Sequence, residues 1–162
     1  MQPVPSTAEI LVFKMLGNNV NKKWIDWAYD MLCAGFEREN LVMLAGELEP
    51  YNQFELQSLA DKVLKELDLT WDNREQVYKN YACYLVGKAI EGSIQPVNVL
   101  NILSNIYIGA DFDPPYSDFY DLYFAYDDLK YSENQWYVAG ATRENIDAVI
   151  RDYFMAWKAK CE

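Results

Sequence analysis

The 162-residue sequence contains no histidine, and its seven glycines are too scattered to form a phosphate-binding loop. Histidine is the commonest general base and metal ligand, so its absence excludes Ser-His-Asp and Cys-His catalytic sites. The glycines occur singly, mostly where predicted helices end, so familiar modes of nucleotide binding are disfavoured. The sequence therefore predicts no cofactor, and an enzyme built on this chain would have to use carboxylates and tyrosines.

Cysteine is also scarce, because Cys33, Cys83 and Cys161 are the whole complement. Their odd number, wide spacing and lack of a CxxC pair predict neither a disulfide framework nor a zinc site. Cys33 and Cys83 fall in apolar stretches and are expected to be small buried side chains. The simplest interpretation is a protein of the reducing cytoplasm. The longest uncharged run, residues 93–110, contains too many polar side chains for a membrane span.

Basic residues are outnumbered, with 14 lysines and arginines against 25 acids, for a net charge of −11. The excess is concentrated in residues 36–75 and 111–133, each of which sums to −6. Negative charge repels nucleic-acid phosphates and anionic lipid, so we expect neither nucleic acid nor membrane as a direct ligand. The charge favours a basic protein partner.

Helix-start signals and apolar periodicity predict an all-α fold. Ser6, Asn52 and Asp72 are capping residues, and each is followed three residues later by a glutamate. Other helices are predicted over residues 22–34, 40–48, 72–91, 96–108 and 142–160. The short stretch WYVAG at Trp136 is the only strand candidate. We expect a single domain over residues 1–162, with seven or eight helices packed as antiparallel hairpins, or alternatively an irregular helical-repeat-like array.

The stretch DFDPPYSDFYDLYFAYDDLKY, residues 111–131, combines eight aromatic rings with six aspartates. On a helical wheel Phe119, Leu122, Tyr123, Tyr126 and Leu129 form an inward face. The remaining rings widen the apolar arc beyond what one packing contact covers. Either a second neighbour such as the last helix covers them, or they form a partner surface. That surface would comprise Asp118, Tyr120, Asp121, Phe124, Asp128 and Tyr131.

Two other groups have a structural and a functional interpretation. Asp111 and Asp113 lie close to Asp118, but the loop lacks the glycine and closing glutamate of a calcium site, so no metal is expected there. Trp24 and Trp27 share a helix face with apolar residues, which indicates core rather than a ligand cage.

The stretch from Trp27 to Leu67, with WAYDMLCAG followed by LVMLAG and an acidic amphipathic helix, resembles a family of uncharacterised bacterial all-helical proteins. The resemblance covers about a quarter of the chain. It implies a bacterial helical protein and brings no activity or site residues.

The first hypothesis is therefore a non-enzymatic acidic binding protein, of the type of the immunity proteins that neutralise bacterial toxins. The second is an enzyme or small-molecule binder that uses carboxylates and tyrosines; if it were metal-dependent, Asp111 and Asp113 would hold the divalent metal. The third is a helical scaffold that self-associates through Trp136 and Tyr137 or through the aromatic strip of Tyr120, Phe124 and Tyr131. The oligomeric state is left open.

Overall fold

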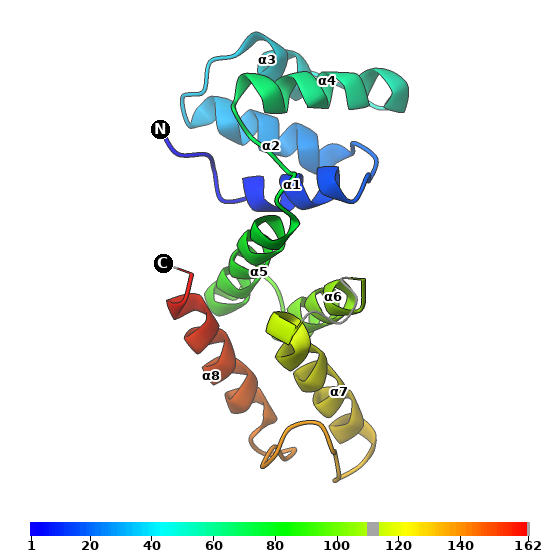
Figure 1. Cartoon of the computed structure of the whole chain (residues 1–162), viewed down its shortest axis with the longest axis vertical. Coiled ribbons are helices and arrows are strands. Elements are labelled where there is room, and N and C mark those ends of the chain that lie inside the picture. The colour runs from blue at the N-terminus through cyan, green and yellow to red at the C-terminus, as the bar shows by residue number, and fades with distance from the viewer. Residues whose placement is uncertain (110–113, 162) are drawn as a thin grey trace. The chain divides into compact units, whose positions relative to one another are not determined.

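A computed structural model describes residues 1–109 and 114–161, and this part of the chain is helical throughout its regular structure. The predicted all-α class is confirmed, with eight α-helices and no strand in those ranges (Figure 1). The elements are α1 (Thr7–Met15), α2 (Lys22–Cys33), α3 (Glu39–Ala45), α4 (Gln53–Glu66), α5 (Arg74–Glu91), α6 (Pro96–Gly109), the short 3-10 turn η1 (Pro114–Tyr116), α7 (Ser117–Tyr131) and α8 (Ile146–Ala159).

The chain forms two compact units, unit 1 (Met1–Tyr81) and unit 2 (Ala82–Glu162). The boundary falls inside α5, so this helix contributes residues to both units. The expectation of one domain over residues 1–162 stays a prediction. The two units are defined by the contacts inside each of them, and this does not decide whether they fold as one domain or as two.

Unit 1 is built around α2, which has α1 on one side and α3 and α4 on the other (Figure 1). Asn21 caps α2 by accepting a hydrogen bond from the backbone N–H of Lys23 at 3.0 Å. Trp24 and Trp27, one helical turn apart, are fully buried and meet edge to face with ring centroids 6.1 Å apart. The indole N–H of Trp27 donates to the Thr7 hydroxyl at 2.9 Å. The prediction that these tryptophans belong to the core is confirmed.

Side-chain hydrogen bonds fix the ends of the helices in unit 1. The amide of Gln53 accepts from the N–H of Val20 at 2.9 Å and donates to its carbonyl at 2.8 Å. Glu66 accepts from the N–H of Leu41 at 3.0 Å, which satisfies a free donor at the start of α3. The predicted cap at Asn52 is confirmed, because its side chain accepts from the Glu55 N–H.

In unit 2, α6 packs against α7, and the ring of Phe119 links α7 to α8. Phe119 is fully buried, with its ring centroid 5.5 Å from Tyr153, 6.3 Å from Phe154 and 4.9 Å from Trp157. Leu122 and Leu129 of the predicted inward face are buried as expected. The other two members of that face are only half-buried, and they are Tyr123 and Tyr126.

The cysteines differ from the prediction. Cys83 in α5 and Cys161 beyond α8 form a disulfide, with Cα atoms 6.0 Å apart and 78 residues between them in sequence. Cys33, expected to be buried, is a free thiol and is exposed at the last residue of α2. Both expectations were wrong because burial and pairing depend on tertiary placement, which cysteine spacing does not encode. A disulfide is typical of an oxidising compartment and counts against the predicted cytoplasmic location.

Several predicted boundaries shift by a few residues. The side chain of Asn73, rather than Asp72, accepts from a first-turn N–H, that of Gln76, so α5 starts at Arg74. Ser6 precedes α1 without a side-chain capping bond. The last helix starts at Ile146 instead of Thr142.

Two further segments, the end of α3 and the loop at Trp136, also differ from what the sequence predicts. Helix α3 ends at Ala45, so Leu48 lies in the following loop. The strand candidate at Trp136 forms bends and turns, with Gln135 accepting hydrogen bonds from the N–H groups of Tyr137 and Val138. These local bonds replace the ladder that a strand would need.

Among the described residues, no helix combines the length and the apolar character that are needed to cross a bilayer. For residues 93–109, which the structure describes, this agrees with the prediction that the uncharged run 93–110 is not a membrane span.

Candidate functional site

The best-supported site is a hollow of about 340 Å³ on unit 2, which we call the α7 acidic pocket. It lies among one face of α7, the loop that follows α7, and one face of α8. Its lining residues are Asp118, Asp121 and Leu122 of α7, Tyr137, Val138 and Ala139 of the loop, and Val149 and Tyr153 of α8. Two carboxylates thus share a hollow with two tyrosines and four small or aliphatic side chains.

The two carboxylates of the pocket have different environments. Asp118 is exposed, and its Oδ2 accepts a hydrogen bond from the Tyr153 hydroxyl at 3.0 Å. Asp121, one turn later, is half-buried, and this burial together with the charge of Asp118 raises its pKa. Burial also raises the pKa of Tyr153, and the hydrogen bond to Asp118 adds to the effect. Tyr153 therefore stays a neutral donor at physiological pH.

The negative charge of α7 is not neutralised locally. Within the described ranges, none of the aspartates of α7 forms an ion pair; the pairs found there involve residues such as Lys14, Lys23 and Lys88. Lys130, the single cation of α7, lies over the ring of Tyr126 at 5.1 Å. Uncompensated carboxylates beside aromatic rings form a favourable environment for a cation.

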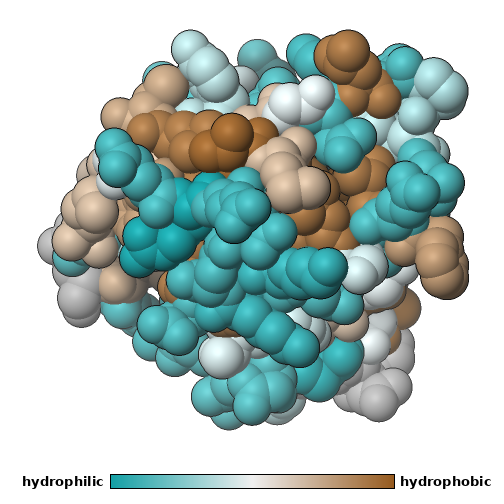
Figure 2. Space-filling view, turned by 90° about the horizontal axis from the view of Figure 1, so that it is seen from above, coloured by the Kyte–Doolittle hydropathy of each residue, from teal (hydrophilic) through white to brown (hydrophobic). Residues whose placement is uncertain are grey.

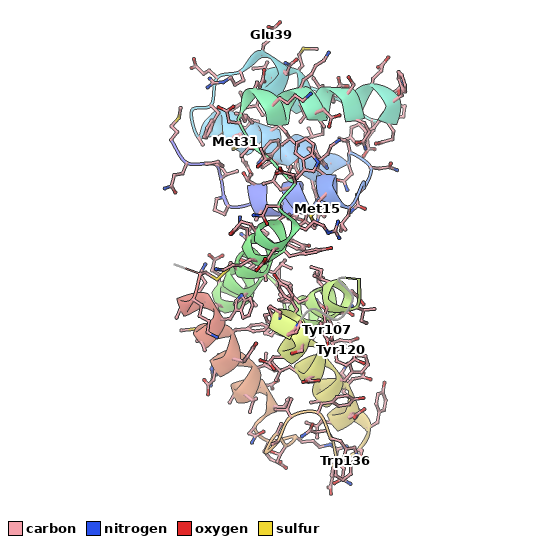
Figure 3. The ribbon with its side chains drawn as sticks, in the orientation of Figure 1. Met15, Met31, Glu39, Tyr107, Tyr120 and Trp136 are labelled. Carbon is pink, nitrogen blue, oxygen red and sulfur yellow. A yellow bond between two sulfur atoms is a disulfide. The ribbon has the colours of Figure 1, made fainter. Side chains whose placement is uncertain are left out.

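An aromatic cluster adjoins the pocket. The ring of Tyr120 lies 5.3 Å from Tyr107 of α6, 4.6 Å from Phe124 and 6.5 Å from Tyr137 (Figure 3). Phe124 also contacts Tyr137, at 5.7 Å. Both Tyr120 and Phe124 are half-buried. The second neighbour considered for these rings is thus supplied mainly by α6 and the loop after α7.

The loop after α7 is held by one amide side chain. Gln135 accepts from the N–H groups of Tyr137 and Val138 at 2.9 and 2.8 Å, and it donates to the carbonyls of Val138 and Ala141. Arg143 donates through Nε to the carbonyl of Leu129 at 2.7 Å, which ties the loop to the end of α7. These bonds place Tyr137 and Val138 against α7.

Two large rings remain exposed near the same end of unit 2. Trp136 is 89% exposed and Tyr131 is 83% exposed. Trp136 projects from the loop away from the ribbon, as Figure 3 shows. Aromatic side chains of this kind are common anchors in protein interfaces.

The predicted partner-binding residues therefore fall into three places. Asp118 and Asp121 lie together in the α7 acidic pocket, while Tyr120 and Phe124 lie in the adjoining aromatic cluster. The remaining two are closer to the end of α7: Asp128 is half-buried, and Tyr131 is exposed.

Sequence reasoning missed the contribution of Tyr137, Val138 and Tyr153 to the pocket. The contact of Tyr153 with α7 follows only from the packing of the last helix on α7, which the sequence pattern does not contain. The predicted breadth of the aromatic arc on α7 was the signal that a second neighbour was required.

Within the described ranges, no three side chains of the metal-binding types lie close enough together to hold a metal ion. Asp111 and Asp113, considered above for a divalent metal, lie outside the described residues.

No protein-family model matches the chain, and neither a curated protein nor a solved structure matches it significantly. The resemblance noted for Trp27 to Leu67 accordingly stays a prediction, and the functional argument rests on the geometry alone.

Proposed function

We propose that this protein is a non-enzymatic binding protein that takes a basic protein partner on the α7 face of unit 2, in the manner of an immunity protein. The contact surface comprises the α7 acidic pocket, the aromatic cluster beside it, and the exposed rings of Tyr131 and Trp136. It includes five of the six residues named from the sequence; the sixth, the half-buried Asp128, belongs to neither the pocket nor the cluster.

The observation that carries the proposal is the pairing of Asp118 and Asp121 in one hollow whose lining, among the described residues, contains no lysine or arginine. A lysine or arginine from a partner would supply the missing positive charge. Its aliphatic stem would pack on Val138, Val149 or the ring of Tyr137. Complementary charge speeds the encounter, and buried aromatic anchors slow dissociation.

Affinity capture from the source cells tests the proposal. The bait is the full chain, and the matched control is the double variant Asp118→Asn, Asp121→Asn, which keeps the shape of the pocket and removes its charge. We expect a basic protein that the parent retains and the variant loses, with retention that falls as salt is raised toward 1 M, where the Debye length is about 3 Å. Equal capture by both baits would contradict the proposal.

A second candidate function is a carboxylate- and tyrosine-based enzyme or small-molecule binder. It is favoured by the raised pKa of Asp121 beside the carboxylate of Asp118, since a carboxyl group with a raised pKa is suited to acid–base chemistry. A ligand present at one hundred times its dissociation constant stabilises the folded state by about 2.7 kcal/mol. Thermal unfolding with magnesium, calcium and manganese, and with small organic cations, would therefore detect it.

The cellular location of the protein is also a matter of proposal, and the cytoplasm was predicted from the sequence. A cytoplasmic protein is expected to keep Cys83 and Cys161 reduced, whereas the structure pairs them. Binding a partner outside the cytoplasm, where the disulfide persists, is the version of the proposal that agrees with the bridge.

A further inference from the structure

Unit 1 exposes a second set of large apolar side chains, remote in sequence from α7. Phe54 is 91% exposed, Leu48 is 80% exposed, and Val42 and Met43 are each more than half exposed. We call these four residues the α3–α4 patch. The core of unit 1 is filled by other residues of the same helices, such as Leu41 and Leu44 of α3 and Leu56, Ala60, Val63 and Leu64 of α4. The patch is therefore not needed to close the core.

Met43 and Phe54 of the patch line a hollow of about 350 Å³ between α3 and α4. Asn40 and Met43 line it from one face of α3, and Glu47 lines it from the segment that follows the end of α3. The lining from α4 consists of Phe54, Glu55, Leu56, Ser58, Leu59 and Lys62. Figure 2 views the chain from above in the orientation of Figure 1, where α3 and α4 lie, and brown and tan areas interrupt the teal surface there.

The surroundings of the hollow are acidic. Residues 37–62 contain six acids and two bases. Of the acids, Asp61 is paired with Lys14, but within the described residues neither Glu47 nor Glu55 in the lining forms an ion pair. Lys62 is the only cation in the lining.

We propose that the α3–α4 patch is a docking site for a basic amphipathic helix of a partner protein. The apolar face of that helix would enter the hollow and cover Phe54 and Met43, and its lysines and arginines would face Glu47 and Glu55. A groove between two helices accepts an amphipathic helix through anchors at i, i+3, i+4 and i+7. Methionine suits such a groove because its unbranched side chain adapts to different partners.

The charge argues for a different protein rather than a second copy of this chain. In a two-fold dimer the same patch faces itself. The interface would then gather Glu47 and Glu55 of both copies against Lys62 as the one cation of each lining, and such an excess of like charge is unfavourable. A basic helix removes this conflict and supplies positive charge to both glutamates.

The test uses the full chain with ¹³C-methyl methionine, which reports on Met43 separately from the other four methionines. The probe is a synthetic leucine–lysine amphipathic peptide of about 18 residues, or about five helical turns. The matched probe has the same leucines with glutamate in place of lysine. We expect the lysine peptide to shift the Met43 methyl signal in a saturable manner and the glutamate peptide to leave it in place.

Variants assign the interaction to the patch. Phe54→Ser removes an almost fully exposed ring. It is expected to weaken the binding of the lysine peptide about tenfold, as is typical when an interface loses an anchor residue. Glu47→Gln with Glu55→Gln is expected to weaken it at low salt and to have less effect at high salt. The control Tyr29→Ser, an exposed ring of unit 1 outside the patch, is expected to leave the Met43 titration unchanged.

An unmoved Met43 signal, an equal response to both peptides, or a dimer in sedimentation that Phe54→Ser abolishes would overturn the proposal. Because the readout is local to unit 1, this outcome is separate from that of the α7 acidic pocket.

Discussion

The hydroxyl of Tyr153 in α8 donates a 3.0 Å hydrogen bond to Oδ2 of Asp118 in α7. Both residues line the α7 acidic pocket, and the bond orients one of its two carboxylates. Beneath it, the Tyr153 ring packs edge to face on Phe119 at 5.5 Å. One side chain thus belongs both to the hydrophobic contact between the two helices and to the proposed binding surface.

Tyr153→Phe separates these two roles, since it keeps the ring and removes the hydroxyl. A hydrogen bond from a neutral hydroxyl to a solvent-exposed carboxylate stabilises the folded state by about 1 kcal/mol or less. We therefore expect the free energy of unfolding to fall by an amount of that order. Urea denaturation measures it. A change of several kcal/mol would mean that the hydroxyl has a structural role that this hydrogen bond does not account for.

Asp121→Asn tests the environment of the other carboxylate through pH. Because the folded state raises the pKa of Asp121, the folded protein binds this proton more tightly than the unfolded chain does. Ionisation of Asp121 therefore lowers stability at pH values above its folded pKa. We expect Asp121→Asn to be more stable than the parent protein at pH 7, with the difference vanishing near pH 3, below the ordinary aspartate pKa of about 3.9.

Thermal unfolding of Asp121→Asn and the parent protein across that range gives the answer. A variant that is less stable at pH 7, or a difference independent of pH, would contradict the environment described for Asp121.

Phe119→Ala tests the packing of α7 on α8. The ring is fully buried against Tyr153, Phe154 and Trp157, and removal of a buried phenylalanine side chain typically costs about 3–5 kcal/mol. The matched control is Tyr131→Ala on the same helix, where the exposed ring predicts a change within about 0.5 kcal/mol. Equal effects of the two substitutions in chemical denaturation would argue against this packing of α7.

Thiol counting tests the cysteine arrangement. Alkylation of the folded protein without reductant is expected to add one label, at Cys33, and alkylation after reduction and unfolding is expected to add three. Cys33→Ser is the control, with no label before reduction and two after it. Intact mass measurement distinguishes these cases. Labelling of all three cysteines without reductant would contradict the bridge between Cys83 and Cys161.

Local features were the most predictable from sequence. The cap at Asn52, the stop of α2 before Gly35 and the stop of α5 before Gly92 follow from short-range rules, and both glycines have positive φ. Where two capping residues stand side by side, as at Asp72 and Asn73, the pattern does not select between them, and the cap falls one residue later than predicted.

Features that depend on distant contacts were not predictable. The pairing of Cys83 with Cys161 requires α5 and the end of α8 to be neighbours, which cysteine spacing does not contain. The position of Tyr137 depends on the hydrogen bonds of Gln135 within an irregular loop. The sequence identified the acidic and aromatic helix, but the partners that complete its pocket came from elements whose placement only the fold determines.

The central claim is that the α7 face binds a basic protein, and site-specific photo-crosslinking from position 136 tests it most directly. A benzophenone amino acid replaces the exposed Trp136 in the source cells, and the same group at exposed Tyr29 of unit 1 is the control. The account predicts a crosslinked basic protein from position 136 only, lost in the background of Asp118→Asn with Asp121→Asn. Crosslinks that are identical from both positions, or that persist without the two carboxylates, would contradict it.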